Sequence, residues 1–450
     1  MKSKYPPNAR LVALDVLHDI HEKGAYASLA LQSRLRETRL APNDRRLATS
    51  IVYTTLEKQD QLDYVLDSLM EHPTQDILMR DILRLSACQI LFHERIPESA
   101  AVNEGVKLAK IVGKDSVSGF LNAVLRNLVR QKEQIIWPDR EKDFAQYLHV
   151  MGNMPMWLVN KLIGIYGNET AEAIIMYQKQ DHSMTIRPNM LKLTDDAFEK
   201  LLNQKSWTWQ RGIAPHAYLI GGAVEIGLDE DYQKGLFSIQ GQSSMLAAEA
   251  VQVKPGMRVL DACAAPGGKT AYMAETMQDT GRVYAWEVHE KRAALLTAMK
   301  KRMKLENLRI SIRDALTPKT DLEGTLDAVL LDAPCTGLGV IGEKPDLKYR
   351  LQEESIPQIV KTQEQLLDMV SRYVKPGGTL VYSTCSILPE ENADQIQNFL
   401  QNHPTFSVQP LPKTYPEAFR KEQTQQGLQL LPYRDHVEGF FIARMQRQRA

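Results

Sequence analysis

The chain has few cysteines. Only four of its 450 residues are cysteine (Cys88, Cys263, Cys335 and Cys385), and no two of them form a C-x-x-C pair. This scarcity argues against a disulfide framework and against a structural zinc site, because both need clustered thiols. We therefore expect reduced thiols, no bound metal and a cytoplasmic location. Cys88 lies on an apolar helical stripe and is expected to be a core residue.

Long apolar runs and net charge are also missing. No segment approaches the ~20 apolar residues that a membrane-spanning helix needs, and the first residues, MKSKYPPNARLVAL, lack the apolar core of a signal peptide. We therefore expect no membrane partner. Basic and acidic residues number 55 each. Any nucleic-acid binding must therefore come from local patches and not from overall charge.

The sequence divides into three stretches of different character. Residues 1–137 show only helical periodicity, which predicts an all-helical domain. Residues 138–235 mix helix and strand signals, as expected for a small α+β connector. In residues 236–450 strands alternate with helices, which indicates an α/β fold with a mostly parallel, doubly wound, Rossmann-like sheet.

Such a sheet binds ligands at the carboxyl ends of its strands, where the strand order reverses. The motifs of this chain that carry chemistry all follow predicted strands. Those strands cover residues 258–263, 283–288, 310–313, 328–332, 379–384 and 440–445.

A glycine-rich turn follows the first of these strands, in VLDACAAPGGKT, residues 259–270. Gly267 and Gly268 leave room for a ligand to approach the backbone, and Lys269 adds a positive charge beside it. A P-loop would need a glycine where Cys263 stands, and the G-x-G-x-x-G fingerprint is absent. The turn therefore predicts a nucleotide-like cofactor but argues against a bound triphosphate or dinucleotide.

Acidic residues lie at the ends of the next three strands. Glu287 is suited to the two hydroxyls of a ribose. Asp314 is placed to meet an adenine edge, and Asp332 ends the fourth strand. Each acid alone would be equally well explained as a helix cap or a surface ion pair. Their recurrence on consecutive strands favours a ligand site.

Two thiols follow the later strands, Cys335 in LLDAPCTGLG and Cys385 in LVYSTCSILPEEN. A thiolate that adds to C6 of a cytosine makes C5 nucleophilic enough to accept a methyl group from S-adenosylmethionine. A thiol is mostly protonated at neutral pH, so the site needs a positive charge or hydrogen-bond donors, for which Lys269 is a candidate. Asp332 is placed to assist at the ring nitrogen N3. This chemistry leaves open which thiol attacks.

These motifs closely resemble those of the RNA cytosine-5 methyltransferases, particularly the bacterial enzymes that act on small-subunit ribosomal RNA. The matching stretches are DACAAPGGKT, LLDAPCTGLGVI, KPDLKY, GGTLVYSTCSILPEEN and EGFFIA. The helical region resembles the family's NusB-like RNA-binding domain in NDRRLATSIVYTTL, AVNEGVKLAK and GFLNAVLRNLVR. The resemblance implies a class I methyltransferase domain, S-adenosylmethionine as cofactor and 16S ribosomal RNA as partner. Glu287 stands where the family usually has aspartate.

The resemblance also implies roles for individual residues. Cys385 corresponds to the nucleophile of the family, and Cys335 to the cysteine that assists breakdown of the covalent adduct. Asp332 and Lys269 complete the implied catalytic set. The implied cofactor-binding residues are Cys263, Ala264, Ala265, Pro266, Gly267, Gly268, Lys269, Glu287, Asp314 and Asp332.

Two runs of basic residues are candidates for phosphate contacts, which position an RNA without reading its sequence. Alone, either run is more often a solvated helix face. A target base must also leave its stack to reach a thiol, which favours unpaired RNA. The runs are Arg34, Arg36, Arg39, Arg45 and Arg46, and Lys300, Lys301, Arg302, Lys304, Arg309 and Arg313.

Two other functions compete with this interpretation. The same chemistry on transfer RNA would use the same residues, although the helical domain favours ribosomal RNA. A catalytically silent RNA-binding assembly factor is disfavoured because Cys335, Cys385, Asp332 and Lys269 are all present. We expect the protein to be a monomer.

Overall fold

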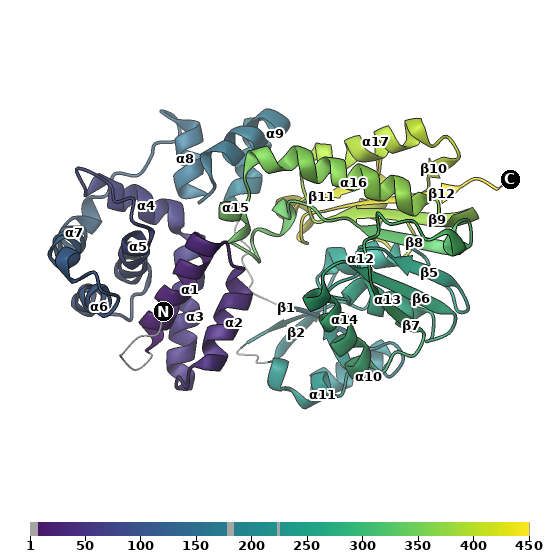
Figure 1. Ribbon diagram of the computed structural model, residues 1–450, viewed down its shortest axis with the longest axis horizontal. Coiled ribbons are helices and arrows are strands. Elements are labelled where there is room, and N and C mark those ends of the chain that lie inside the picture. Colours follow the sequence, from purple (N-terminus) through teal and green to yellow (C-terminus); the bar gives the residue numbers. More distant parts are fainter. Residues whose placement is uncertain (1–7, 178–183, 223–225, 450) are drawn as a thin grey trace. The chain divides into compact units, whose positions relative to one another are not determined.

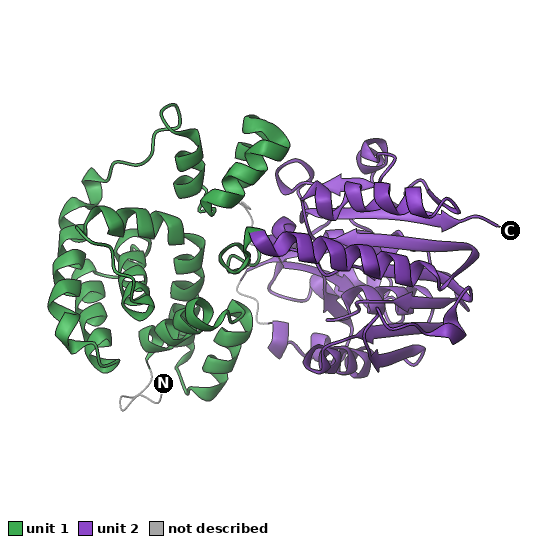
Figure 2. Ribbon diagram, turned by 45° about the horizontal axis from the view of Figure 1, so that its top comes forward, with its two compact units in different colours: residues 1–177, 341–353 green, residues 178–340, 354–450 purple. Residues whose placement is uncertain are grey.

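The computed structural model describes residues 8–177, 184–222 and 226–449. These residues belong to two compact units (Figure 2). Unit 1 contains the residues up to 177 together with 341–353, and unit 2 contains the remainder. The domain boundaries expected from the sequence, at residues 137 and 235, stay predictions.

Unit 1 is helical. Asn8 caps its first helix by accepting hydrogen bonds from the backbone N–H groups of Arg10 and Leu11. The predicted stripe that contains Cys88 is buried in α5, and burial raises the pKa of this thiol to about 12, so it is a core residue. The helices are α1 (Ala9–Lys23), α2 (Ala27–Glu37), α3 (Pro42–Glu57), α4 (Gln59–Ser68), α5 (Ile77–Phe92), α6 (Glu98–Ile111), α7 (Ser118–Gln131), α8 (Phe144–Met151), α9 (Met156–Met176) and α15 (Leu347–Arg350).

The segment 341–353 lies within unit 1, although the sequence around it belongs to the α/β region. The Tyr349 hydroxyl donates a hydrogen bond to Asp60 at 3.0 Å. Lys348 is buried and its ammonium donates to the backbone carbonyl of Asn153. The KPDLKY motif is therefore packed within the helical unit.

The first part of unit 2 is a small α+β subdomain, as the sequence predicted. Its antiparallel sheet has the order β2-β3-β1-β4. Phe198 packs against Tyr218 and Phe237, with ring centroids 5.1 and 5.9 Å away. The elements are β1 (Met184–Pro188), α10 (Asp195–Leu202), β2 (Thr208–Arg211), β3 (Tyr218–Gly221), α11 (Glu230–Gln233) and β4 (Phe237–Ile239).

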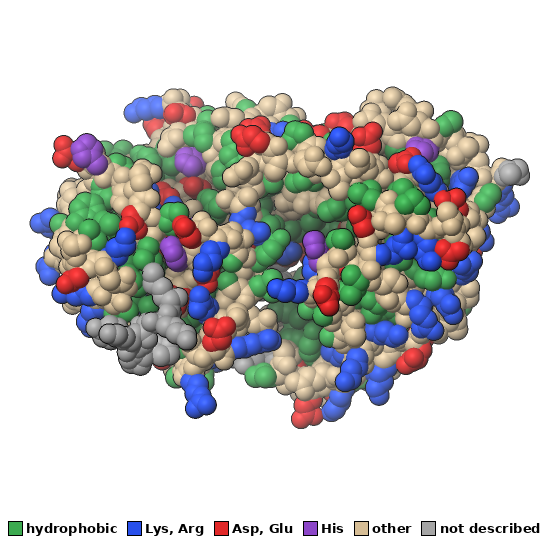
Figure 3. Space-filling view, in the orientation of Figure 1, with side chains coloured by type: hydrophobic (Ala, Val, Ile, Leu, Met, Phe, Trp, Pro, Cys, Tyr) green, Lys and Arg blue, Asp and Glu red, His purple; other side chains and the backbone are tan. Residues whose placement is uncertain are grey.

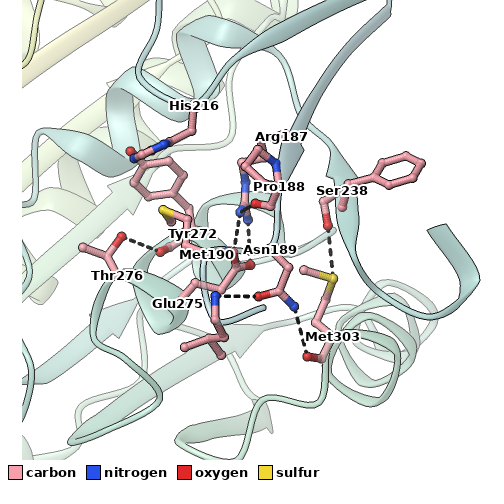
Figure 4. Close-up of polar contacts among 12 residues, drawn as sticks. Arg187, Pro188, Asn189, Met190, His216, Ser238, Tyr272, Glu275, Thr276 and Met303 are labelled. Atoms are coloured by element: carbon pink, nitrogen blue, oxygen red, sulfur yellow. Dashed lines mark hydrogen bonds and ion pairs between the residues drawn. The ribbon is translucent and has the colours of Figure 1, made fainter. Parts of the chain in front are cut away.

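A buried ion pair joins this subdomain to the large sheet region (Figure 4). Arg187 of β1 and Glu275 of α13 (Gly268–Thr276) are both fully buried, and two hydrogen bonds of 2.7 and 3.0 Å connect them. Arg187 also donates to the Gln240 side chain at 2.7 Å. Its guanidinium lies over the Tyr272 ring, 5.2 Å from the centroid. Loss of either charge would leave the other buried without its partner.

The large sheet of unit 2 has the order β10-β12-β9-β8-β5-β6-β7, with β11 paired to β12. Strands β5 to β9 are parallel, and β12 runs antiparallel to β9. Its elements are α12 (Gln242–Glu249), β5 (Arg258–Asp261), β6 (Arg282–Glu287), α14 (Glu290–Met303), β7 (Leu308–Ile312), β8 (Leu326–Asp332), α16 (Ile356–Ser371), β9 (Val374–Thr384), α17 (Ala393–Asn402), β10 (Phe406–Val408), α18 (Glu417–Glu422), β11 (Leu428–Leu430), α19 (Pro432–Asp435) and β12 (Phe440–Arg447).

Helices cover both faces of this sheet, with α16 and α17 on one side and α12, α13 and α14 on the other (Figure 1). Val259 of β5 packs into the core under α13 and α14, and the next residue, Leu260, packs into the opposite core. Burial on both faces explains the nearly continuous apolar runs of these strands. The predicted α/β, doubly wound fold is confirmed, and β10 and β11 are additional strands.

The strand order reverses between β5 and β8, because β6 and β7 lie on one side of this pair and β9 on the other. A ligand crevice is therefore expected at the carboxyl ends of β5 and β8. Among the described residues, none of the helices has the length and apolar character needed to cross a membrane.

Candidate active site

The sulfur atoms of Cys335 and Cys385 lie 3.4 Å apart. Cys335 is in the loop after β8, and Cys385 directly follows β9. These two strands are parallel neighbours, with Asp332 aligned to Ser383, so their carboxyl ends lie side by side. The fold thus brings together two thiols that are 50 residues apart in the sequence.

The environments of the two sulfurs differ. The hydrogen bond with Cys385 raises the pKa of Cys335 well above its usual value, and burial raises it further. Both effects favour the protonated form of Cys335. A third thiol, Cys263, follows β5, and burial raises its pKa as well, so it also stays protonated.

Lys269 supplies a positive charge at the same strand ends. Its ammonium lies 2.7 Å from one oxygen of Asp332, whose other oxygen accepts a hydrogen bond from the Ser383 hydroxyl at 2.9 Å. The ammonium also lies over the ring of Phe440, 5.0 Å from its centroid. Burial alone would lower the pKa of Lys269, but attraction to Asp332 and then to Cys385 outweighs it and raises the pKa. Lys269 therefore remains charged and favours a thiolate at Cys385.

The glycine-rich turn connects β5 to α13. The Ala265–Pro266 peptide bond is cis, and Gly267 has a φ of 111°. A Cβ atom at Gly267 would lie 2.6 Å from Met299 and 2.9 Å from Leu296 of α14. The left-handed backbone conformation favours glycine here, and any side chain would also have to displace the ends of Met299 and Leu296.

Asp261, which ends β5, was not among the predicted site residues. One of its carboxylate oxygens accepts a hydrogen bond from the Thr270 hydroxyl at 2.6 Å. The other is buried and has no hydrogen-bond partner within the described residues. Burial raises the pKa of Asp261 to about 7. The sequence signal was present, since Asp261 ends its strand as Glu287 and Asp332 end theirs.

The two remaining predicted acids occupy different environments. Glu287 ends β6 and is buried, and one of its oxygens accepts a hydrogen bond from the His289 backbone N–H at 2.9 Å. Asp314 lies two residues beyond β7 and is exposed, and its carboxylate accepts from the Leu316 N–H at 2.9 Å. These groups fit a ligand that carries an ammonium group and hydroxyls. The unpartnered buried oxygen of Asp261 suits the ammonium group, and the carboxylate of Glu287, at the end of the neighbouring strand, suits the hydroxyls.

Several residues of the two basic runs are used within the protein. Arg302 donates to the carbonyls of Tyr232 and Phe237, and Arg34 forms an ion pair with Asp19. Lys and Arg side chains are nevertheless numerous where Figure 1 draws α14 and β7 (Figure 3). The exposed members of the runs are Arg36, Arg39, Arg45, Arg46, Lys301, Lys304 and Arg309.

The part of the chain that the structure describes contains no group of three or more His, Cys, Asp or Glu residues able to hold a metal ion.

Three family models match successive parts of the chain. Residues 7–130 match the NusB family, and residues 154–226 match the ferredoxin-like domain of RsmF/B-like methyltransferases. Residues 248–446 match the 16S rRNA methyltransferases RsmB/F. The three models follow the same order as the helical region, the connector and the large sheet.

Whole-chain relatives agree with these matches. A probable ribosomal RNA small subunit methyltransferase B from Synechocystis is 33% identical, and the match covers 98% of this chain and 99% of the relative. A protein of the same description from Bacillus subtilis is 34% identical, with the same coverage. The crystal structure of PH0851 covers 99% of this chain and all of its own, with a TM-score of 0.82 and 27% identity.

Proposed function

The chain belongs to the RsmB/F family of 16S ribosomal RNA methyltransferases, and we propose that it methylates carbon 5 of a cytosine in 16S ribosomal RNA through a covalent bond to Cys385. The observation that carries this proposal is the contact of two thiols, 3.4 Å apart, beside a charged lysine. A methyltransferase acting on a nitrogen or oxygen atom would have no use for two adjacent thiols. An aromatic carbon needs activation, which a thiolate supplies.

In the first step the Cys385 thiolate adds to C6 of the cytosine. The new bond joins Sγ to C6, and the electron pair of the C5–C6 double bond moves to C5. Lys269 stabilises the thiolate before attack. With Asp332, it also holds a proton that can hydrogen-bond to the ring nitrogen N3, which makes C6 more electrophilic.

S-adenosylmethionine supplies the electrophilic methyl carbon that C5 receives. The residues that would hold it are Asp261, Glu287 and the turn around Gly267. Asp261 would offer a buried oxygen to the ammonium of its methionine part, and Glu287 would offer a carboxylate to its ribose hydroxyls. Gly267 keeps the backbone of the turn free of a side chain.

In the last step the C5 proton leaves and the Sγ–C6 bond breaks. Once Cys385 is bound to carbon, it no longer carries the charge that held the proton on Cys335. Cys335 can then release its proton to solvent and take the proton from C5. The C5–H electron pair restores the double bond, and Cys385 departs as a thiolate. One proton is released for each methyl group transferred, so the step balances.

The adduct can be trapped with a 16S transcript that contains 5-fluorocytidine, because fluorine at C5 cannot leave as a cation. Wild-type protein with S-adenosylmethionine should form a protein–RNA species that survives denaturing electrophoresis. Cys385→Ala should form none, whereas Cys88→Ala, which removes a core thiol of unit 1, should form it normally. A transfer RNA transcript tests the competing substrate. Methylation by the Cys385→Ala protein would refute the proposed chemistry.

A further inference from the structure

A completely buried carboxylate lies beneath the two thiol loops. Glu391 belongs to the short 3₁₀ turn Pro389–Glu391 that follows β9. One of its oxygens accepts hydrogen bonds from the Thr336 backbone N–H and the Gln363 side-chain amide, both at 2.9 Å. The other oxygen accepts from the hydroxyl of Thr336 at 2.5 Å and from the hydroxyl of Ser386.

Both hydroxyl donors are immediate neighbours of the thiols, because Thr336 follows Cys335 and Ser386 follows Cys385. A single carboxylate therefore connects the loop after β8 to the loop after β9. A backbone hydrogen bond from Gly339 to the Cys385 carbonyl, 2.9 Å long, connects the same loops elsewhere. Loss of the carboxylate would thus loosen the pair of thiols without separating the loops completely.

The charge of Glu391 is held by neutral donors alone. Its donors are one backbone N–H, two hydroxyls and one amide, and within the described residues it forms no ion pair with lysine, arginine or histidine. After the hydrogen bond with Cys385 and burial, the negative charge of Glu391 is a further cause that raises the pKa of Cys335. A buried carboxylate that only stabilised the fold would have no need to contact both neighbours of the thiols.

We propose that Glu391 is a positioning residue of the methyl-transfer site, which fixes the distance between the Cys335 and Cys385 sulfurs through Thr336 and Ser386. The role rests on the proposed function, since the two sulfurs must act on adjacent atoms of one ring, Cys385 on C6 and Cys335 on the proton of C5, in successive steps. Glu391 itself touches neither the cytosine nor the methyl donor.

The first test compares Glu391→Gln with Asp394→Asn. Glutamine keeps the volume but replaces one acceptor by an NH₂ donor, which faces hydroxyl groups that need an acceptor. Asp394 is exposed on α17, so its variant makes the same kind of change away from the thiols. We expect Glu391→Gln to lower kcat about 100-fold, as for a small misplacement of reacting groups. The KM values for S-adenosylmethionine and for the 16S transcript should stay near those of the wild type.

A second measurement reports the sulfur separation without any substrate. Phenylarsine oxide reacts with two adjacent thiols, forming two As–S bonds and releasing water, so the arsenic is not reduced. Wild-type and Asp394→Asn proteins should bind one equivalent that protects Cys335 and Cys385 from alkylation. Glu391→Gln should bind it at least about 10-fold more weakly. Mere loss of fold stability would lower the melting temperature without this selective loss of arsenical binding.

Thr336→Val keeps the proposal testable if Glu391→Gln fails to fold. Valine removes one hydroxyl but keeps the backbone N–H bond to Glu391, so kcat should fall about 10-fold with weakened arsenical binding. Wild-type kcat or wild-type arsenical affinity in a folded Glu391→Gln protein would overturn the positioning role. Methyl transfer by Cys385→Ala would instead overturn the proposed function. The two failures can be told apart because arsenical binding reports the sulfur separation and does not depend on methyl transfer.

Discussion

Replacing Arg187 by methionine should destabilise unit 2 by about 4 kcal/mol, the cost of leaving a buried charge without its partner. Arg187 and Glu275 are both fully buried. The substitution removes both guanidinium hydrogen bonds from Glu275, whose one remaining donor among the described residues is the Met190 backbone N–H at 3.0 Å. It also leaves the Gln240 carbonyl without its donor. At about 2–4 °C per kcal/mol for a unit of this size, the melting temperature should fall by about 8–16 °C.

An exposed pair provides the matched control for this prediction. Arg140 binds Glu172 with two hydrogen bonds of similar length, 2.8 and 2.7 Å, but its side chain is 47% exposed. Arg140→Met should therefore change the free energy of unfolding far less than Arg187→Met does, because water screens an exposed ion pair. The measurement is urea unfolding followed by intrinsic fluorescence, together with differential scanning calorimetry.

The double variant Arg187→Met/Glu275→Met gives the sharper check. It removes both charges at once, so it should recover much of the stability that Arg187→Met alone loses. If Arg187→Met lowers the free energy of unfolding no more than Arg140→Met does, the buried Arg187–Glu275 pair does not hold the α+β subdomain on α13. A double variant less stable than Arg187→Met would show that the uncompensated charge of Glu275 is not what destabilises the single variant.

Three further predictions concern the site itself. Cys335→Ala should form a protein–RNA adduct that survives denaturing electrophoresis even when the RNA contains no fluorinated base. A variant that is active and forms no adduct would show that Cys335 is not needed to release the RNA from Cys385. Glu287→Ala should weaken S-adenosylmethionine binding by about 10-fold or more while RNA binding stays unchanged, and calorimetry showing the reverse would reject the ribose contact. Burial raises the pKa of Asp261 to about 7, so its neutral form stabilises the fold at low pH and this contribution is lost as the pH rises through about 7. In the wild-type protein this titration should lower the free energy of unfolding by about 2.5 kcal/mol between about pH 5 and about pH 8, and Asp261→Asn should remove that decrease. An unchanged pH dependence in the variant would show that Asp261 does not titrate in this range.

The strands and their ends were predictable because the signals are local. Apolar runs bounded by turn residues predicted β5, β6, β8 and β9, and each motif directly follows its strand. The contact between Cys335 and Cys385 depends on which strands are neighbours. The sequence placed both thiols at strand ends, but the β8–β9 register that aligns Asp332 with Ser383 arises only in the folded sheet.

The residues that sequence reasoning missed have distant partners. Glu391 lies 55 residues from Thr336 and 28 from Gln363, so no periodicity connects them. Arg187 and Glu275 are 88 residues apart. Arg302 belongs to a run of basic residues that the sequence offered as candidates for phosphate contacts, and the fold uses its guanidinium to bind the Tyr232 and Phe237 carbonyls.

Charge around the two sulfurs is distributed unequally, and this inequality gives identical side chains different chemistry. Lys269 is attracted to Cys385 and favours its thiolate, whereas the hydrogen bond with Cys385, burial and, to a smaller extent, the negative charge of Glu391 favour the protonated form of Cys335. A reaction that needs one sulfur to attack and another to hold a proton requires this asymmetry. Iodoacetamide at neutral pH should therefore alkylate Cys385 before Cys335, because the thiolate is the reactive form. Mass spectrometry of the labelled peptides measures the order, and Lys269→Met should reduce the preference. Equal labelling of the two thiols in the wild-type protein would show that their surroundings do not distinguish them, and the assignment of attack to Cys385 would lose its electrostatic basis.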